Sequence, residues 1–224
     1  HFVEVARAFK SAFPNEEFWI TEWNYKFSLI LPVKEYEEWV TGMSGATGNL
    51  EFIKNASGEI NHPVMNFYRV IGHFRDWGVC HWRDSSNWDY TASGHALKWL
   101  ANFEDTELKI INNSSSVSAR ASSGNGNIKV LLWNHNSPRD IVSLTILLNG
   151  AKAYSYEVWK MDRNHTVESL FYRPYPAPYN DFTTIHLPVP YLVEQGSDEL
   201  NDFKREFVID SNEIVYVLLH VNSK

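Results

Sequence analysis

The chain has 224 residues, of which 44% are hydrophobic and 15% are aromatic, and its formal net charge is −7. This hydrophobic content argues against disorder, and no basic stripe indicates a nucleic-acid partner. No apolar run approaches the length of a membrane span. The length exceeds that of a single small domain, so we expect a sizeable core and more than one domain.

The first elements are a predicted helix and a predicted strand. Residues 1–13 place apolar side chains at helical spacing, and Pro14 ends the helix. The apolar run that follows predicts a strand over residues 18–23. The apolar run itself ends at the sequence Thr-Glu-Trp-Asn. A buried strand therefore delivers a carboxylate and an amide, flanked by tryptophans, to its carboxyl end.

A long stretch, residues 25–61, separates this strand from the next predicted element. Its middle, residues 41–49, reads TGMSGATGN and is rich in glycine. A short helix is expected near residues 34–39, and we interpret the remainder as a loop. Loops of this length in compact domains are usually functional or flexible.

Two further helices and a strand complete the first half. His62-Pro63 predicts the start of a helix over 62–77, because proline is well tolerated in the first turn. Residues 79–82 read as a short buried strand, and residues 93–103 as a helix with Ser93 as its N-cap. Helices and strands thus alternate, which favours a parallel α/β architecture.

The sequence pattern changes near residue 105. From there, short strand-like runs are separated by turns rich in Ser, Gly and Asn, and no long helical pattern occurs. Such spacing is typical of an antiparallel β-sandwich. We therefore expect an α/β domain over 1–104 and a β-sandwich over 105–224.

Glu22 is the main candidate for chemistry. Ligands of parallel α/β folds bind at the carboxyl ends of the strands, and packing gives no reason for a carboxylate there. Retaining cleavage of glycosides needs two carboxyl groups about 5–5.5 Å apart, one as nucleophile and one as acid/base. Aromatic neighbours such as Trp23 can stack on sugar rings. The alternative is a solvated or salt-bridged glutamate at a strand end.

Other side chains are expected on the same rim. Trp82 ends the next predicted strand, which would make it the spatial neighbour of Glu22, and the loop after that strand supplies more. The substrate-binding residues predicted from their positions are Trp23, Trp82, Asp84 and Trp88. The sequence therefore predicts a carbohydrate pocket lined by tryptophans.

The sequence resembles glycoside hydrolase family 39, a clan A family that includes β-xylosidases and α-L-iduronidases. The resemblance rests on ITEWN at 20–24, IKVLLWNHN at 128–136, LLNG at 147–150, YEVWKMDRNHTVES at 156–169 and EQGSDEL at 194–200. The family's R-I-D-x-x-H-S-N run has its counterpart at 160–167, where the Ser-Asn positions differ. Asp162 and His165 of this run are interpreted as a structural hydrogen-bonded corner.

By this resemblance, residues 1–104 are the C-terminal part of a (β/α)8 barrel, from helix 6 to helix 8. Residues 18–23, 62–77 and 79–83 match strand 7, helix 7 and strand 8. Glu22 matches the catalytic nucleophile, and Trp82 matches the aromatic residue that floors the sugar subsite. The resemblance also implies substrate-binding roles for His62, on the return from the long loop to helix 7, and for Asn24, which alternatively holds the loop after strand 7.

The family's acid/base is a glutamate in an Asn-Glu pair at the end of strand 4. The sequence begins after that point, and Glu16 of its own Asn-Glu pair precedes strand 7, so it receives no role. Five of sixteen barrel elements cannot close a sheet. We therefore expect the missing N-terminal part of the barrel to be a partner, and this chain alone to be inactive.

The remaining expectations concern metals, cofactors and location. The nine histidines show no metal-binding spacing, and the covalent route needs no cofactor. Glycosylation sequons begin at Asn55, Asn112, Asn113 and Asn164 and would permit glycosylation in a secretory pathway. The expected location is secreted, lysosomal or otherwise extracytoplasmic. Two rival hypotheses are a non-catalytic carbohydrate-binding protein derived from a glycosidase barrel and a sandwich that acts as a separable interaction module.

Overall fold

The computed structural model describes residues 2–16, 19–23, 42–59, 64–67, 71–72, 80–82, 88–148, 153–172, 182–199 and 202–222. The elements are α1 (Phe2–Ala12), β1 (Trp19–Trp23), α3 (Met43–Glu59), β2 (Val64–Phe67), β3 (Ile71–Gly72), β4 (Cys80–Trp82), β5 (Trp88–Tyr90), α4 (Ala92–Ala101), β6 (Thr106–Glu107), β7 (Val117–Gly124), β8 (Asn127–Asn134), β9 (Asp140–Ile146), β10 (Ala153–Met161), β11 (Thr166–Tyr172), β12 (Phe182–Pro188), β13 (Tyr191–Glu199), β14 (Phe203–Ile209) and β15 (Ile214–Asn222). No helix within these ranges is long and apolar enough to cross a membrane.

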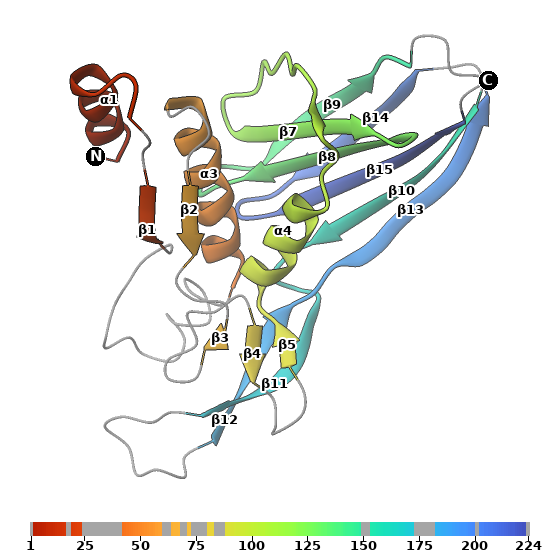
Figure 1. The fold of residues 1–224 in the computed structure, drawn as a ribbon. Coiled ribbons are helices and arrows are strands. Elements are labelled where there is room, and N and C mark those ends of the chain that lie inside the picture. Colours follow the sequence, from red (N-terminus) through yellow and green to blue (C-terminus); the bar gives the residue numbers. More distant parts are fainter. Residues whose placement is uncertain are drawn as a thin grey trace.

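The first half contains the expected parallel pairing. Strand β1 pairs with β2 in parallel, and α3 connects them as the crossover helix. Helix α1 contacts α3 and lies beside β1 (Figure 1). The strand predicted over 18–23 is confirmed at 19–23, and the helix predicted over 1–13 is confirmed at 2–12.

The helix predicted over 62–77 is wrong. This segment holds β2 and β3, and the helix of the crossover is α3, which begins at Met43 inside the stretch interpreted as a loop. The apolar residues of 62–77 fit strand and helix spacing alike, and the early proline favoured the wrong choice. The short helix expected near 34–39 lies outside the described residues.

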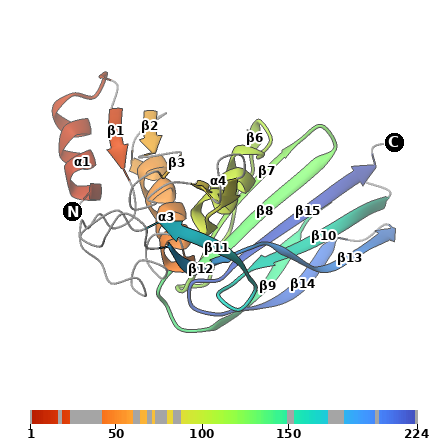
Figure 2. The same cartoon turned by 90° about the horizontal axis from the view of Figure 1, so that it is seen from below.

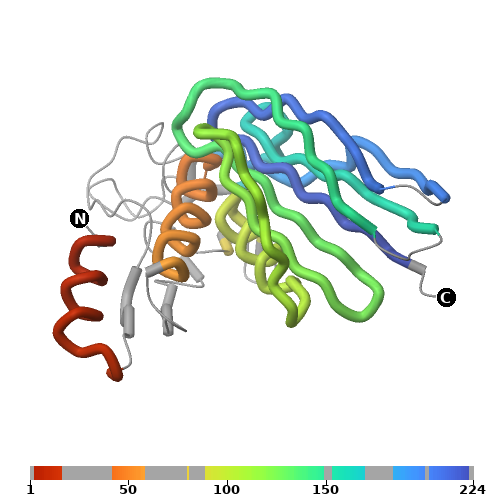
Figure 3. Tube along the Cα trace, turned by 90° about the horizontal axis from the view of Figure 1, so that it is seen from above, coloured from red at the N-terminus to blue at the C-terminus, as the bar shows by residue number. Residues whose placement is uncertain are grey.

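Helix α3 is rich in small residues, which suit its close packing against α1, α4 and β8. Residues 42–50 are all buried, and the buried apolar side chains recur at helical spacing: Met43, Ala46, Leu50, Ile53 and Ala56. Figure 3 shows α3 between α1 and the strands of the largest sheet. Glycine lowers helix propensity, but close packing on several sides offsets that cost.

Helix α4 begins one residue earlier than predicted and has a different cap. Thr91 is the N-cap, and its side chain accepts a hydrogen bond from the backbone N–H of Gly94 at 3.1 Å. Ser93, the predicted cap, is buried, and its hydroxyl accepts a hydrogen bond from Nδ2 of Asn49 in α3 at 3.0 Å. The serine therefore joins two helices.

The second half is rich in strands, as expected. A six-stranded sheet, the large sheet, has the order β13-β10-β15-β8-β7-β6. The antiparallel β9–β14 pair covers one of its faces (Figure 1). Their shared core, the strand core, is formed by the buried residues Val117, Ala121, Val130, Leu132, Ile146, Tyr154, Tyr156, Val158, Phe203, Phe207, Ile209, Val215, Val217 and Leu219.

The other face of the large sheet packs on helices α3 and α4. This helix–sheet core consists of the buried residues Met43, Ala46, Leu50, Ala92, Ala96, Leu131, Trp133, Met161, Ile214 and Tyr216. Neighbouring residues of β8 and β15 alternate between the two cores, as successive strand side chains must. Because both faces are covered, these strands read as continuous apolar runs. The two halves of the sequence share a core.

We expect Leu50→Ala to lower the free energy of unfolding by about 2–5 kcal/mol, because it opens a cavity in the helix–sheet core. Leu50 is 2% exposed. The matched control is Ile141→Ala on β9, where the side chain is 60% exposed and the loss should stay below about 1 kcal/mol. Urea unfolding followed by circular dichroism measures both. Equal losses would contradict the layered packing.

Candidate functional site

Glu22 lies near the carboxyl end of β1, where the β1–β2 register is irregular. Ile20 pairs with Met65 and Trp23 pairs with Phe67, so Thr21 and Glu22 together face the single residue Asn66. Such a bulge changes the direction of a side chain, and bulges are frequent beside active sites. The strand end predicted to carry chemistry therefore has a backbone feature suited to it.

The predicted site residues fall into two groups. The structure describes the strand positions of four of them: Glu22 and Trp23 end β1, Trp82 ends β4 and Trp88 begins β5. Asn24, His62 and Asp84 lie outside the described residues. Asn66, which the register places beside Glu22, was not among the candidates, because its segment was assigned to a helix.

The prediction that Trp82 ends the strand next to that of Glu22 is corrected by the strand pairing. The strand beside β1 is β2, and β4 lies between β3 and β5 in a separate three-stranded sheet. In this small sheet Trp82 is directly opposite Trp88. The sheet lies at the end toward which β1 and β2 run (Figure 1). Both tryptophans are thus carried by adjacent strands at the carboxyl ends of the parallel pair.

Asp162 and His165 form a structural corner, as predicted. Tyr191 donates its hydroxyl hydrogen to Oδ2 of Asp162 at 2.7 Å, and Nδ1 of His165 lies 3.0 Å from Oδ1. The backbone N–H groups of Asn164 and His165 donate to Oδ1 as well. The His165 ring stacks on Tyr191 with centroids 3.6 Å apart. The carboxylate thus holds the turn between β10 and β11.

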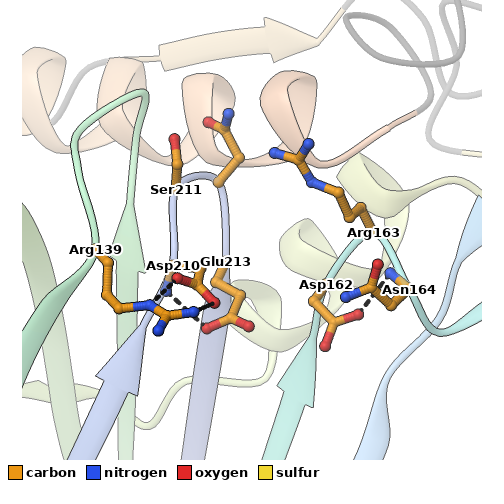
Figure 4. A pocket seen from close by; sticks show the side chains of 8 residues that line it. Arg139, Asp162, Arg163, Asn164, Asp210, Ser211 and Glu213 are labelled. Atoms are coloured by element: carbon orange, nitrogen blue, oxygen red, sulfur yellow. Dashed lines mark hydrogen bonds and ion pairs between the residues drawn. The ribbon is translucent and has the colours of Figure 1, made fainter.

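A polar cavity of about 280 Å³ adjoins this corner (Figure 4). It is lined by Arg139, Asp162, Arg163, Asn164, Asp210, Ser211, Asn212 and Glu213. Arg139 is paired with Asp210, and Nζ of Lys160 lies 3.2 Å from Oε2 of Glu213. Because these charges neutralise one another locally, the cavity favours neither a cation nor an anion.

Glu51 is a second well-bonded carboxylate that sequence reasoning did not single out. Its Oε2 accepts hydrogen bonds from Nε1 of Trp133 at 3.0 Å and from Oγ of Ser118 at 2.7 Å. Burial raises the pKa of the Glu51 carboxyl, but its hydrogen bonds and the nearby Lys54 outweigh burial and hold the pKa below its ordinary value. Through its hydrogen bonds with Ser118 and Trp133, Glu51 connects α3 to β7 and β8. Across the described ranges, no three His, Cys, Asp or Glu side chains gather as a metal site would require.

Comparison with known proteins gives matches in structure. No protein-family model matches the sequence, and no curated protein matches it either. A GH39 enzyme from Xanthomonas axonopodis pv. citri superposes with a TM-score of 0.66 at 14% identity, covering 97% of this chain and 48% of the enzyme. A glucosidase from Croceicoccus marinus gives a TM-score of 0.65 at 12% identity, covering 99% of this chain and 50% of the other.

An arabinose-bound GH51 α-L-arabinofuranosidase is also similar, with a TM-score of 0.60, 13% identity and coverage of 99% of this chain and 35% of that one. The chain therefore spans half or less of the length of these proteins. At such low identity, the likeness concerns the fold. This chain thus shares a fold with several glycoside hydrolases, and the likeness extends across both halves of the chain.

The Asp162 corner predicts a loss of stability in acid. Burial raises the pKa of Asp162, but the hydrogen bonds from Tyr191 and His165 outweigh burial, so the pKa lies below its ordinary value. A depressed folded-state pKa contributes stability above the unfolded-state value, and this stability is lost as pH falls through the folded-state value. We expect unfolding free energies measured between pH 7 and about pH 3 to fall more steeply for wild type than for Asp162→Asn.

At neutral pH, Asp162→Asn should be the less stable protein, because the buried charged acceptor that holds the turn is lost. The control is Asp140→Asn, since Asp140 accepts a hydrogen bond from Ser114 at the start of β9 and belongs to no such corner. Parallel pH profiles for wild type and Asp162→Asn would contradict the role of this carboxylate.

Proposed function

We propose that this chain belongs to a retaining glycoside hydrolase and that Glu22 is its catalytic nucleophile. The observation that carries the proposal is the position of Glu22 in a bulge at the carboxyl end of a parallel strand, in a fold shared with glycoside hydrolases. Catalytic residues of (β/α)8 enzymes lie at this end of the strands. Glu22 attacks the anomeric carbon, and water later hydrolyses the glycosyl-enzyme intermediate.

The reaction needs a second carboxyl group to protonate the leaving group, a contribution of about 10²–10⁴-fold. Two described carboxylates, Glu51 and Asp162, are engaged in structural hydrogen bonds and are poor candidates. We propose that residues 1–104 form part of a (β/α)8 barrel, that further barrel elements supply the acid/base, and that 105–224 form a β-sandwich. Val5 and Phe13 of the α1 region, 48% and 54% exposed, support packing against such elements.

The substrate class is a glycan with a β-xyloside-like or uronide-containing unit. Trp23, Trp82 and Trp88 supply aromatic surface for the sugar, with Asn24, Asp84 and His62 as polar partners. The structural neighbours include a glucosidase and an arabinofuranosidase, so one fold accommodates different sugars, and the sugar must be set by the loops. No cofactor takes part in this route.

The proposed location is secreted or lysosomal. Three of the sequon asparagines, Asn112, Asn113 and Asn164, are exposed, and Asn164 lies in the turn after β10. Exposed turns are accessible to glycosylation. The same compartment would give the enzyme access to extracellular or lysosomal glycans.

Glu22→Gln in the full-length protein should abolish covalent labelling by a 2-fluoro glycoside inactivator, because the amide cannot act as nucleophile. Mass spectrometry of the digested protein measures the label, and circular dichroism checks the fold. Glu16→Gln, which changes an exposed glutamate in the turn before β1, should label as wild type does. A label found on another residue would contradict the assignment, and absence of any label would favour a carbohydrate-binding protein without catalysis.

The 224-residue chain by itself should not hydrolyse an aryl β-xyloside, because leaving-group protonation requires the second carboxyl group. The release of nitrophenol is measured against an equal amount of full-length protein. Turnover by the chain alone, abolished by Glu22→Gln, would show that both catalytic carboxylates lie within it and would overturn this part of the proposal.

A further inference from the structure

A hydrogen bond from a buried hydroxyl connects the strand-rich half to the small β3–β4–β5 sheet. Oγ of Ser169, in β11, donates to Oδ2 of Asp89, in β5, at 2.9 Å, across 80 positions of sequence. Ser169 is 3% exposed. A hydroxyl buried in this way stabilises one arrangement of the two strands, because either partner alone would lose hydrogen bonding with water.

The β11–β12 pair that carries Ser169 is separate from the two main cores. Ile185 is the register partner of Ser169, and Ile185 and Leu187 are both fully buried. Neither residue belongs to the strand core or to the helix–sheet core. Figure 1 shows the pair extending from the large sheet to the side of the molecule where β4 and β5 lie, and Figure 2, seen from below, shows β11 and β12 in front of the helices. Its buried face is thus turned to a different surface.

Asp89 lies in the middle of β5, directly after Trp88 and opposite His81 of β4. The same ladder pairs Trp82 with Trp88. A contact that fixes Asp89 therefore fixes the backbone of both strands on which these tryptophans are carried. Sites that bind sugars need their aromatic groups held in place, since a small displacement weakens stacking and orientation.

The geometry points to Ser169 as a positioning residue that holds β4 and β5, and with them Trp82 and Trp88, in place for the saccharide. This inference rests on the proposed function for the identity of the ligand. Ser169 acts through Asp89 and does not touch the substrate. The strand-rich half thereby takes part in substrate binding through one side chain.

The test uses the full-length protein labelled with 5-fluorotryptophan, with resonances assigned by single Trp→Phe variants. Ser169→Ala should shift or broaden the fluorine resonances of Trp82 and Trp88 and leave that of Trp133 unchanged. The matched control, Ser118→Ala, also removes a hydroxyl that donates to a carboxylate, Oε2 of Glu51, and should change Trp133 instead. Ser169→Thr keeps the hydroxyl and should restore the wild-type spectrum.

Kinetics with an aryl β-xyloside provide the second readout. Ser169→Ala should raise KM about tenfold with kcat nearly unchanged, as expected when one hydrogen bond that orients the binding site is lost. Unchanged Trp82 and Trp88 resonances, an unchanged KM, or the same effects from Ser118→Ala would overturn the inference. If wild type neither turns over nor labels at Glu22, the proposed function fails separately, and the resonances alone decide whether Ser169 holds β4 and β5.

Discussion

The central strands β8 and β15 of the large sheet are buried on both faces, and the other elements are arranged around them. One face is covered by the β9–β14 pair and the other by α3 and α4. Trp133 illustrates the second contact, because it is 1% exposed in the helix–sheet core and donates its ring N–H to Glu51 of α3. The helices cannot leave the sheet without exposing this core and an unpaired indole.

This arrangement determines where the candidate site lies. Helix α3 is the crossover between β1 and β2, so its attachment to the large sheet also holds the parallel pair. The carboxyl ends of β1 and β2 then run toward the β3–β4–β5 sheet, which β11 reaches through Ser169. The strand-rich half thus contributes to the framework of the site as well as to stability.

Two carboxylates among the described residues, Asp162 and Glu51, are also held in place by several contacts. Asp162 accepts hydrogen bonds from Tyr191, from His165 and from backbone N–H groups of its turn, so its burial is compensated. The burial of Glu51 is compensated in the same way by four donors, which are Lys54, Asn55, Ser118 and Trp133. Their depressed pKa values report structural bonding. The perturbed pKa values therefore mark structural carboxylates, and the proposal for Glu22 rests instead on its position at a strand end.

The sequence alone determined much of the local structure. Helix α1, strand β1, the strand-rich second half and the Asp162 corner follow from spacing, turn residues and local hydrogen bonding, which act over short distances along the chain. The carboxylate at position 22 was identifiable for the same reason, since an apolar run ending in Thr-Glu-Trp-Asn is a local signal.

The remaining features of the fold and of the candidate site depend on contacts between different elements. The segment 43–59 is rich in small residues that resemble a loop, and only its enclosure by α1, α4 and β8 makes such a helix favourable. The choice of β2 over a helix at 62–77 and the bulge at Glu22 both depend on the pairing of β1 with β2, which are distant in sequence. The pairing of Trp82 with Trp88 depends on the contact between the neighbouring strands β4 and β5. Pairing and close packing are properties of two surfaces in contact, so neither segment's own sequence specifies them.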